Sequence, residues 1–221
     1  TYPSKTADYT MIMGVNEQGY DPEKHKIISN ASCTTKALAV PINTLMGHGI
    51  CIDALLMDTT HAATASQRVL ESLGQIVTHS TGAAKATGDV IPELKGKMSG
   101  FSYRVPTLDG SFASLYFVAN YPRELTREKI NNLFKIAAKY EHLRIGVFEE
   151  EEMSSNDIIG RRENGVVLLS KTAVIPLPYR EPEIDRQDNR TYLVGVVSAY
   201  DNELASSVDP VLIARHIADK I

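Results

Sequence analysis

The sequence predicts an α+β domain built on a mixed, mostly antiparallel sheet. Segments rich in β-branched and aromatic residues recur along the chain, as strands require. Helical segments lie among them without the strict alternation that a parallel sheet needs. The chain has 221 residues, 43% of them hydrophobic, so it can bury a sizeable core.

The individual elements follow from composition and spacing. Strands are expected at residues 9–15, 26–29, 50–59, 100–105, 111–120, 165–169 and 192–199. Helices are expected after Cys33, at residues 67–73, after Thr81, at residues 126–140 and from Asp209 to the end. The helix at 126–140 is the clearest, because its apolar residues share one face.

One cysteine lies where an apolar strand becomes a helix. Asn30 and Ser32 are good helix caps, which puts Cys33 in the first turn. Unpaired N–H groups and the positive end of the helix dipole favour the reactive thiolate there. Cys33 is therefore a candidate nucleophile. Cys51 lies inside an apolar run and is expected to be an ordinary core residue.

A thiol nucleophile needs a base, and His61 is the best candidate. It directly follows the strand at 50–59, at a strand end where active-site groups collect. His79 is undecided. The remaining histidines are expected to be structural or solvated, namely His25, His48, His142 and His216.

Two segments indicate an anion site. Ser80-Thr-Gly-Ala-Ala-Lys85 combines hydroxyl groups, a glycine and the start of a helix, so its N–H groups could cradle a phosphate. Arg104 lies inside an apolar strand, where a guanidinium usually has an anionic partner. Together with Cys33 and His61, these segments suggest a thiol, a base and an anion site.

Composition excludes several classes of partner. A net charge of −4 with dispersed Lys and Arg gives no general attraction to nucleic acid or to a membrane surface. Two cysteines, no recognisable signal peptide and no apolar run near about 18 residues lead us to expect the cytoplasm. The run of glutamates at 149–152 reads as a solvated loop, so no metal site is expected.

Five motifs occur in the order found in phosphorylating glyceraldehyde-3-phosphate dehydrogenases, and the chain resembles that family over nearly its whole length. The motifs are Ser29-Asn-Ala-Ser-Cys-Thr-Thr35, Thr60-His-Ala-Ala-Thr64, Ser80-Thr-Gly-Ala-Ala-Lys85, Tyr103-Arg-Val-Pro-Thr107 and Tyr200-Asp-Asn-Glu203. The resemblance implies the family's catalytic domain, with helices covering one face of the sheet. The chain differs from the usual family pattern at Lys36, where the family has Asn, and in a shorter segment between Thr64 and Ser80.

The resemblance also implies a role for each matching residue. Cys33 would attack the aldehyde of glyceraldehyde 3-phosphate, and His61 would take the hydroxyl proton as hydride leaves for the nicotinamide. Inorganic phosphate would then attack the thioester and release 1,3-bisphosphoglycerate. The substrate phosphate would bind Thr64 and Arg104, the attacking phosphate would bind Ser32, Thr34, Thr81 and Gly82, and Asn202 would hold the nicotinamide carboxamide.

By the same resemblance, residues 1–31 would be the last strands of a dinucleotide-binding domain and residues 32–221 the catalytic domain. NAD or NADP would be bound mainly by upstream residues, because no glycine-rich dinucleotide motif lies in this chain. The chain alone is therefore expected to be inactive. The family implies a homo-oligomer, a tetramer, acting in glycolysis.

Two alternatives from other functional classes stay open. One is a related enzyme acting on another phosphorylated aldehyde, such as erythrose 4-phosphate, for which the shortened segment would be the cause. The other is a non-enzymatic redox or regulatory protein on the same scaffold, with Cys33 as an oxidisable thiol.

Overall fold

The computed structural model describes residues 4, 6–63, 74–140, 143–178 and 190–221. Its helices are α1 (Cys33–Gly47), α2 (Ala83–Val90), α3 (Arg127–Ala137) and α4 (Leu204–Ala218). Its strands are β1 (Tyr9–Thr10), β2 (Ile28–Ser29), β3 (Cys51–Ala62), β4 (Val77–His79), β5 (Met98–Val105), β6 (Ser111–Tyr121), β7 (Ile145–Phe148), β8 (Gly165–Leu168), β9 (Ala173–Pro176) and β10 (Arg190–Tyr200).

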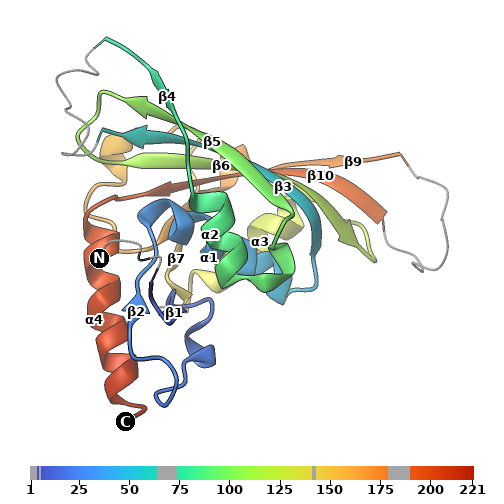
Figure 1. Cartoon of the computed structure of the whole chain (residues 1–221). Coiled ribbons are helices and arrows are strands. Elements are labelled where there is room, and N and C mark those ends of the chain that lie inside the picture. The colour runs from blue at the N-terminus through green and yellow to red at the C-terminus, as the bar shows by residue number, and fades with distance from the viewer. Residues whose placement is uncertain (1–3, 5, 64–73, 141–142, 179–189) are drawn as a thin grey trace.

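The main sheet is mixed and mostly antiparallel. Its strands follow the order β4-β5-β3-β6-β10-β8-β7, and β9 also pairs with β10. The pairs β3–β5 and β7–β8 are parallel, and the other neighbours are antiparallel. Figure 1 shows α1, α2 and α3 on one face of the sheet, while the described part of the chain leaves the other face uncovered. The predicted fold class is confirmed.

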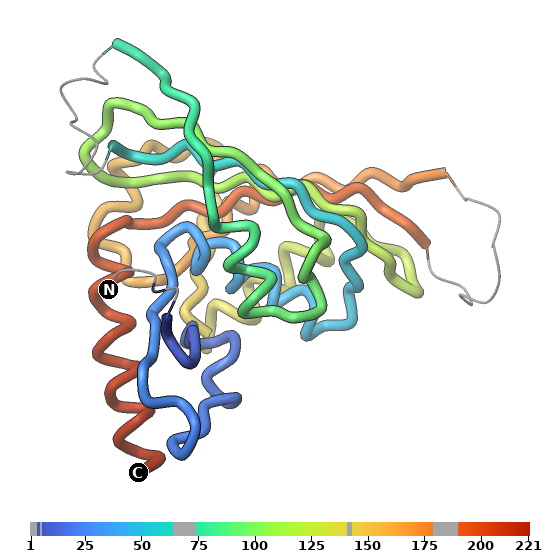
Figure 2. Tube along the Cα trace, viewed as in Figure 1, coloured from blue at the N-terminus to red at the C-terminus, as the bar shows by residue number. Residues whose placement is uncertain are grey.

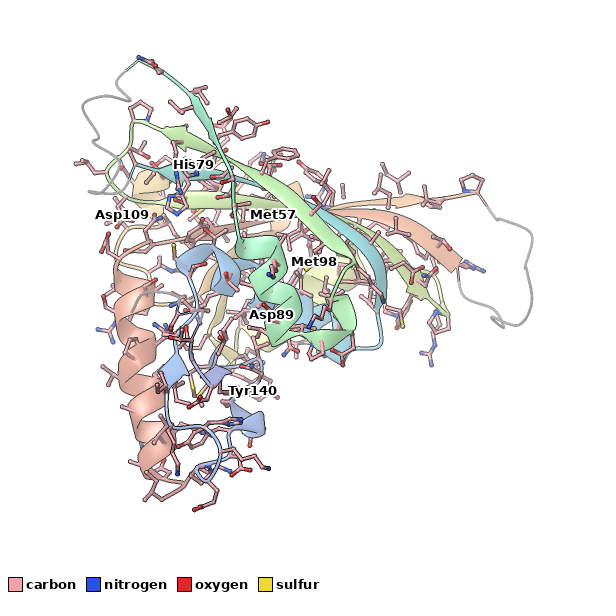
Figure 3. The ribbon with its side chains drawn as sticks, in the orientation of Figure 1. Met57, His79, Asp89, Met98, Asp109 and Tyr140 are labelled. Carbon is pink, nitrogen blue, oxygen red and sulfur yellow. The ribbon has the colours of Figure 1, made fainter. Side chains whose placement is uncertain are left out.

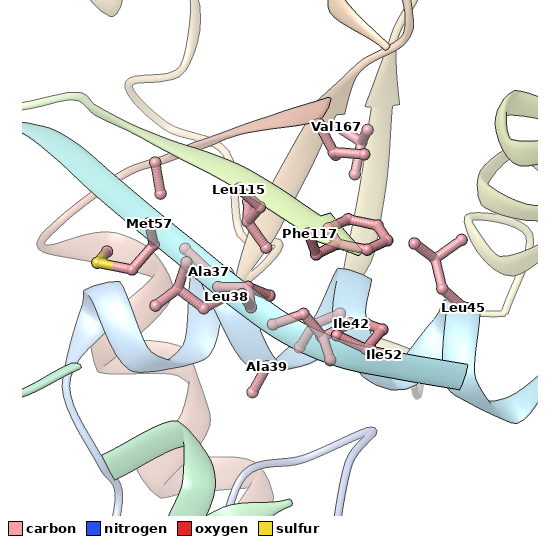
Figure 4. Close-up of a cluster of buried hydrophobic side chains, with 14 of the residues drawn as sticks. Ala37, Leu38, Ala39, Ile42, Leu45, Ile52, Met57, Leu115, Phe117 and Val167 are labelled. Atoms are coloured by element: carbon pink, nitrogen blue, oxygen red, sulfur yellow. The ribbon is translucent and has the colours of Figure 1, made fainter. Parts of the chain in front are cut away.

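Helix α1 is the centre of the core. Residues 34–42 are all buried, as expected for a helix that is surrounded on every side. Figure 4 shows its side chains Leu38 and Ile42 against Ile52 of β3 and Phe117 of β6. Because side chains packed this closely leave little free space, α1 can take only one position relative to the sheet. The helix therefore fixes the place of its first residue, the candidate nucleophile.

Helix α4, which is red in Figure 2, lies beside the blue N-terminal segment of the chain. Pro210 lies inside α4 and has no N–H, so the carbonyl of Ser206, four residues earlier, lacks its helical donor. The Nδ2 group of Asn30 donates to this carbonyl oxygen at 3.2 Å. Near the end of α4, His216 Nε2 donates to the carbonyl oxygen of Glu17 at 3.0 Å. The short parallel pair β1–β2 thus docks on the last helix.

Most predicted elements are present, with shifted ends. The strand expected at 9–15 stops after β1, because the chain turns at Gly14, whose φ is +83°. The helix expected from Asp209 begins earlier, at Leu204, since Asp201 Oδ1 accepts the N–H groups of Glu203 and Leu204. Strands β4, β7 and β9 were not predicted. The helix expected at 67–73 lies outside the described residues.

The expectation that Cys51 is a core residue is wrong. Side chains alternate between the two faces of a strand, and Ile50 and Ile52 take the buried positions on either side. Cys51 consequently points away from the core and is exposed. The apolar run correctly predicted a strand at this place. It did not show that the side chain of Cys51 lies on the exposed face of that strand.

Truncating a side chain beneath the sheet should be costly. Phe117 is 1% exposed and packs on α1, so Phe117→Ala should lower the free energy of unfolding by about 3 to 5 kcal/mol. Urea unfolding followed by circular dichroism measures this change. Val211→Ala on α4, where the side chain is 69% exposed, is the control and should change it by less than about 0.5 kcal/mol. Equal effects of the two substitutions would contradict the assigned core.

Candidate active site

Cys33 is the first residue of α1, as predicted. Ser32 is the N-cap, and its Oγ accepts the N–H of Thr35 at 3.1 Å. The preceding residue, Ala31, has a φ of +54°, a left-handed conformation that is uncommon for alanine. This turn redirects the chain from β2 into the helix and holds the cysteine at the helix start.

His61 contacts the thiol from the far end of β3. Its Nε2 lies 3.6 Å from Cys33 Sγ, a distance at which sulfur forms a hydrogen bond. Its Nδ1 lies 2.7 Å from the carbonyl oxygen of Ala62, which can only accept, so Nδ1 carries the proton of the neutral ring. Nε2 is therefore the basic nitrogen, and it faces the thiol. The structure brings together the two residues predicted as nucleophile and base.

Burial keeps both groups of this pair neutral. It raises the pKa of the Cys33 thiol, against the lowering effect of Lys36, the Thr34 N–H and Arg104. It also lowers the pKa of His61 to about 4, although the hydrogen bond to Ala62 acts in the opposite direction. His61 is thus a neutral acceptor near pH 7. Proton transfer within the pair can then accompany attack by the sulfur.

Arg104 lies next to His61 in the sheet. The two residues are register partners in the parallel pair β3–β5, so their side chains project from the same face. Arg104 Nε and Nη1 are buried and have no hydrogen-bond partner among the described residues. Buried guanidinium nitrogens that lack a partner in the described part of the chain are suited to bind an anion, which agrees with the anion site expected from the sequence.

Tyr200 forms a buried hydroxyl chain that the sequence analysis did not identify. Its hydroxyl oxygen lies 2.9 Å from Thr34 Oγ1 and 3.1 Å from Thr59 Oγ1. Its ring meets the ring of His61 edge to face, with centroids 6.0 Å apart. The Thr34 hydroxyl is thereby engaged in the protein interior, and Tyr200 supports the imidazole. The sequence signal for this buried hydroxyl was a tyrosine at the end of a long strand of alternating residues.

Asn202 also reaches the imidazole. Its Nδ2 donates to His61 Nε2 at 3.0 Å, while its Oδ1 accepts the Ser111 hydroxyl at 3.0 Å. Its backbone N–H donates to Asp109 Oδ1 at 2.9 Å, and Figure 3 shows Asp109 at the end of the sheet beside the start of α4. The amide is therefore oriented by Ser111, and its donor group faces the Cys33–His61 pair.

The other predicted phosphate-binding residues are only partly gathered here. Ser32 Oγ lies 2.6 Å from Thr35 Oγ1 and serves the helix cap. Thr81 Oγ1 accepts the N–H of Ala83 at 3.2 Å and Gly82 precedes α2, and no described hydrogen bond links either residue to Cys33 or His61. Thr64 lies outside the described residues.

Most of the other histidines bond to the backbone. The contacts are Asp21 N to His25 Nδ1 at 3.0 Å, His48 Nδ1 to Thr44 O at 2.8 Å, His79 Nδ1 to Ser80 O at 2.9 Å and the bond from His216 given above. These contacts agree with structural roles for His25, His48 and His216, while His142 lies outside the described residues. His61 is the described histidine that contacts a cysteine.

A cavity of about 270 Å³ lies elsewhere, between β2 and α4. Its lining includes Ile28, Asn30 and Pro210 but neither Cys33 nor His61, so it is separate from the chemistry. Within the described residues, no group of three or more His, Cys, Asp and Glu side chains is arranged to hold a metal ion. None of the described helices is long and apolar enough to cross a membrane.

A mixed sheet that sets a cysteine at a helix start against a histidine at a strand end is typical of a thiol-dependent catalytic domain. Residues 32–202 match the family model described as glyceraldehyde 3-phosphate dehydrogenase, C-terminal domain. The chain therefore belongs to the glyceraldehyde-3-phosphate dehydrogenase family, as the motifs indicated.

Curated relatives agree with this family. The chain is 38% identical over 229 residues to a glyceraldehyde-3-phosphate dehydrogenase of Geobacillus stearothermophilus, covering 99% of this chain and 63% of the relative. It is 41% identical over 169 residues to glyceraldehyde-3-phosphate dehydrogenase 2 of Streptomyces avermitilis, covering 72% of this chain and 50% of the relative. For glyceraldehyde-3-phosphate dehydrogenase 3 of Saccharomyces cerevisiae the identity is 35%, covering 99% and 64%. The chain thus spans less than two thirds of these proteins.

The depressed pKa of His61 should make folding stability depend on pH. The unfolded chain takes up a proton near the ordinary value of 6.5, whereas the folded chain does so only near about 4. The neutral imidazole of His61 therefore contributes its full share of the free energy of unfolding above about pH 6.5. As the pH falls to about 4, protonation of His61 in the unfolded chain alone should lower the free energy of unfolding by about 3 kcal/mol. Urea unfolding at several pH values should show a shallower pH dependence for His61→Gln. Parallel curves for the two proteins would contradict a buried neutral imidazole.

Proposed function

We propose that this chain is the catalytic domain of an NAD(P)-dependent phosphorylating aldehyde dehydrogenase that converts glyceraldehyde 3-phosphate to 1,3-bisphosphoglycerate through a cysteine thioester. The observation that carries the proposal is the contact of 3.6 Å between Cys33 Sγ and His61 Nε2 beside Arg104, whose buried Nε and Nη1 have no hydrogen-bond partner among the described residues. A nucleophile, a base and a cation for a phosphate are the three groups that this reaction needs from the protein.

Cys33 and His61 share the proton transfers. The sulfur attacks the aldehyde carbon as its proton moves to His61 Nε2, and the proton then passes to the carbonyl oxygen to give a thiohemiacetal. His61 Nε2 afterwards accepts the hydroxyl proton when the carbon is oxidised. The resulting thioester conserves the energy of oxidation, and inorganic phosphate displaces the sulfur. The hydrogen bond from His61 to Ala62 keeps Nε2 directed at the sulfur throughout.

Asn202 fits the role of holding the nicotinamide carboxamide. Its amide is 9% exposed, is oriented by Ser111 and lies against the imidazole, so it can offer a hydrogen bond at the reacting centre. NAD or NADP supplies the hydride acceptor when bound. Upstream residues of a longer protein would bind the rest of the cofactor, so this chain by itself should show negligible oxidation of the aldehyde.

Arg104 should give the site its preference for a phosphorylated aldehyde. With the exposed Cys51 replaced by Ser, glyceraldehyde 3-phosphate should protect Cys33 from iodoacetamide at lower concentration than glyceraldehyde. Arg104→Gln should weaken the protection by the phosphorylated compound about 10- to 100-fold, because it removes hydrogen bonds to a charged group. Mass spectrometry of the alkylated peptide measures this, and needs no cofactor. Erythrose 4-phosphate, tested in the same way, discriminates between the two phosphorylated aldehydes.

The control is Arg162→Gln, which removes an exposed arginine and should leave protection unchanged. Equal protection by the phosphorylated and unphosphorylated aldehydes would contradict the proposed substrate class. Absence of protection by any aldehyde would favour a regulatory thiol.

We further propose that a second copy of the chain covers the open face of the sheet. This face, here named the uncovered sheet face, carries exposed apolar side chains on adjacent strands: Leu56, Phe101, Tyr116, Ile175 and Leu193. Each of them is between 39% and 54% exposed, and a contiguous patch of this kind marks an interface. A self-complementary contact between two such faces gives a symmetric dimer.

Leu193→Lys should therefore dissociate the oligomer, since it buries a charge in the contact. Ile136→Lys on α3 is the matched control, because that side chain is also exposed, at 47%, but lies on the helical side of the sheet. Sedimentation velocity distinguishes the two. A monomeric parent chain, or the same effect of both substitutions, would show that another surface forms the oligomer.

A further inference from the structure

A cluster of charged side chains lies buried beneath the start of α1. Lys36 Nζ lies 3.3 Å from Asp209 Oδ2, and Arg144 Nε lies 3.1 Å from Asp209 Oδ1. Their side chains are 1%, 0% and 7% exposed for Lys36, Asp209 and Arg144. Asn164 Nδ2 also donates to Asp209 Oδ1 at 3.3 Å. The reaction outlined above uses none of these groups.

The position of Lys36 directs its charge toward Cys33. Lys36 follows Cys33 by three residues, so both lie on one side of the first turn. Side chains on a helix lean toward its N-terminus, which carries the ammonium back toward the thiol. Lys36 is accordingly the largest of the influences that lower the pKa of Cys33. Burial lowers the pKa of Lys36 itself, against the raising effect of Asp209 and of Cys33.

Among the described residues, the charges of the cluster do not balance. Two cations, Lys36 and Arg144, share the single carboxylate of Asp209, and Lys36 Nζ has no hydrogen bond of good geometry among the described residues. An excess buried positive charge is costly unless an anion lies near it. The Cys33 thiolate can be that anion, because the ammonium is too deeply buried to touch a ligand from solvent.

The remaining polar and charged groups around Cys33 do not replace this charge. His61 on β3 is neutral near pH 7, and Tyr200 on β10 has its pKa raised by burial. Arg104 on β5 also lowers the pKa of Cys33, but more weakly than Lys36 does, and its guanidinium is the proposed anion binder. The group that remains to stabilise a thiolate at Cys33 is the Lys36 ammonium, which is paired with Asp209.

We propose that Lys36 is a positioning residue whose buried ammonium, anchored by Asp209, offsets the cost of forming the Cys33 thiolate. The inference rests on the proposed function, since it takes Cys33 as the nucleophile. It assigns Lys36 no contact with substrate. Asp209 holds the ammonium in place through one carboxylate oxygen, and Arg144 binds the other oxygen.

The test is the pH profile of Cys33 alkylation in the full chain carrying Cys51→Ser. Lys36→Asn removes the charge and leaves Asp209 paired with Arg144, so the buried site stays balanced. Its Cys33 pKa should rise by about one unit or more, which slows alkylation about tenfold at any pH below both pKa values. Lys135→Asn is the matched control, because Lys135 pairs with Glu149 at the surface and is 41% exposed. It should leave the profile unchanged.

A folded Lys36→Asn protein with the parent profile would overturn the proposal and make Lys36 purely structural. If that variant does not fold, the parent chain still decides the question. Carbamidomethylation of Cys33 removes the thiolate, so NMR of lysine Cε should show Lys36 losing its proton at a lower pH afterwards. An unchanged Lys36 titration would also overturn the proposal. Failure of the proposed function appears separately, as a lack of protection of Cys33 by the phosphorylated aldehyde.

Discussion

The buried carboxylate of Asp209 is the constraint on which the arrangement of the site depends. A carboxylate without access to water must be paired, and removing its partners typically costs about 3 to 5 kcal/mol. Lys36, Arg144 and Asn164 converge on it from α1 and from the segments that precede β7 and β8. Arg144 even adopts a φ of +55°, an unfavourable conformation for this residue, while it pairs with Asp209. The helix that begins with Cys33 and the helix that follows Asn202 are thereby held to each other.

The site combines burial with a small number of fixed donors. Burial works against charge on Cys33 and on His61, so neither group ionises readily alone. The same low polarity strengthens each remaining electrostatic interaction, because little water screens it. Hydrogen bonds from Ser111 to Asn202 and from His61 to Ala62 then set the directions of the polar atoms. Before any reaction, the Cys33–His61 pair is therefore defined by the orientation of two neutral groups and not by an ion pair.

Local sequence signals predicted the parts of the structure that local forces determine. The cap at Ser32 and the alternating strand before His61 depend on neighbouring residues, and both are present. The strands β4, β7 and β9 have three or four residues each, which is too short for a periodic signal. The environment of Lys36 could not be predicted, because Asp209 lies far along the chain and only packing brings the two together. The sequence offers one signal that Lys36 is buried, namely the apolar run at 37–40 that directly follows it.

The hydrogen bond from Asn30 to the carbonyl of Ser206 spans 176 residues, and it exists because Pro210 leaves that carbonyl free. Asn30 lies three residues before Cys33, so the segment that leads into the candidate nucleophile is tied to α4. Contacts that join distant parts of a chain form late, because closing a long loop costs entropy before the contact rewards it. During synthesis α4 also emerges after every other element described above. The Cys33 thiol therefore reaches its native environment only after α4 has packed on the rest of the domain. The rate at which Cys33 is alkylated then indicates how much of the chain has completed folding.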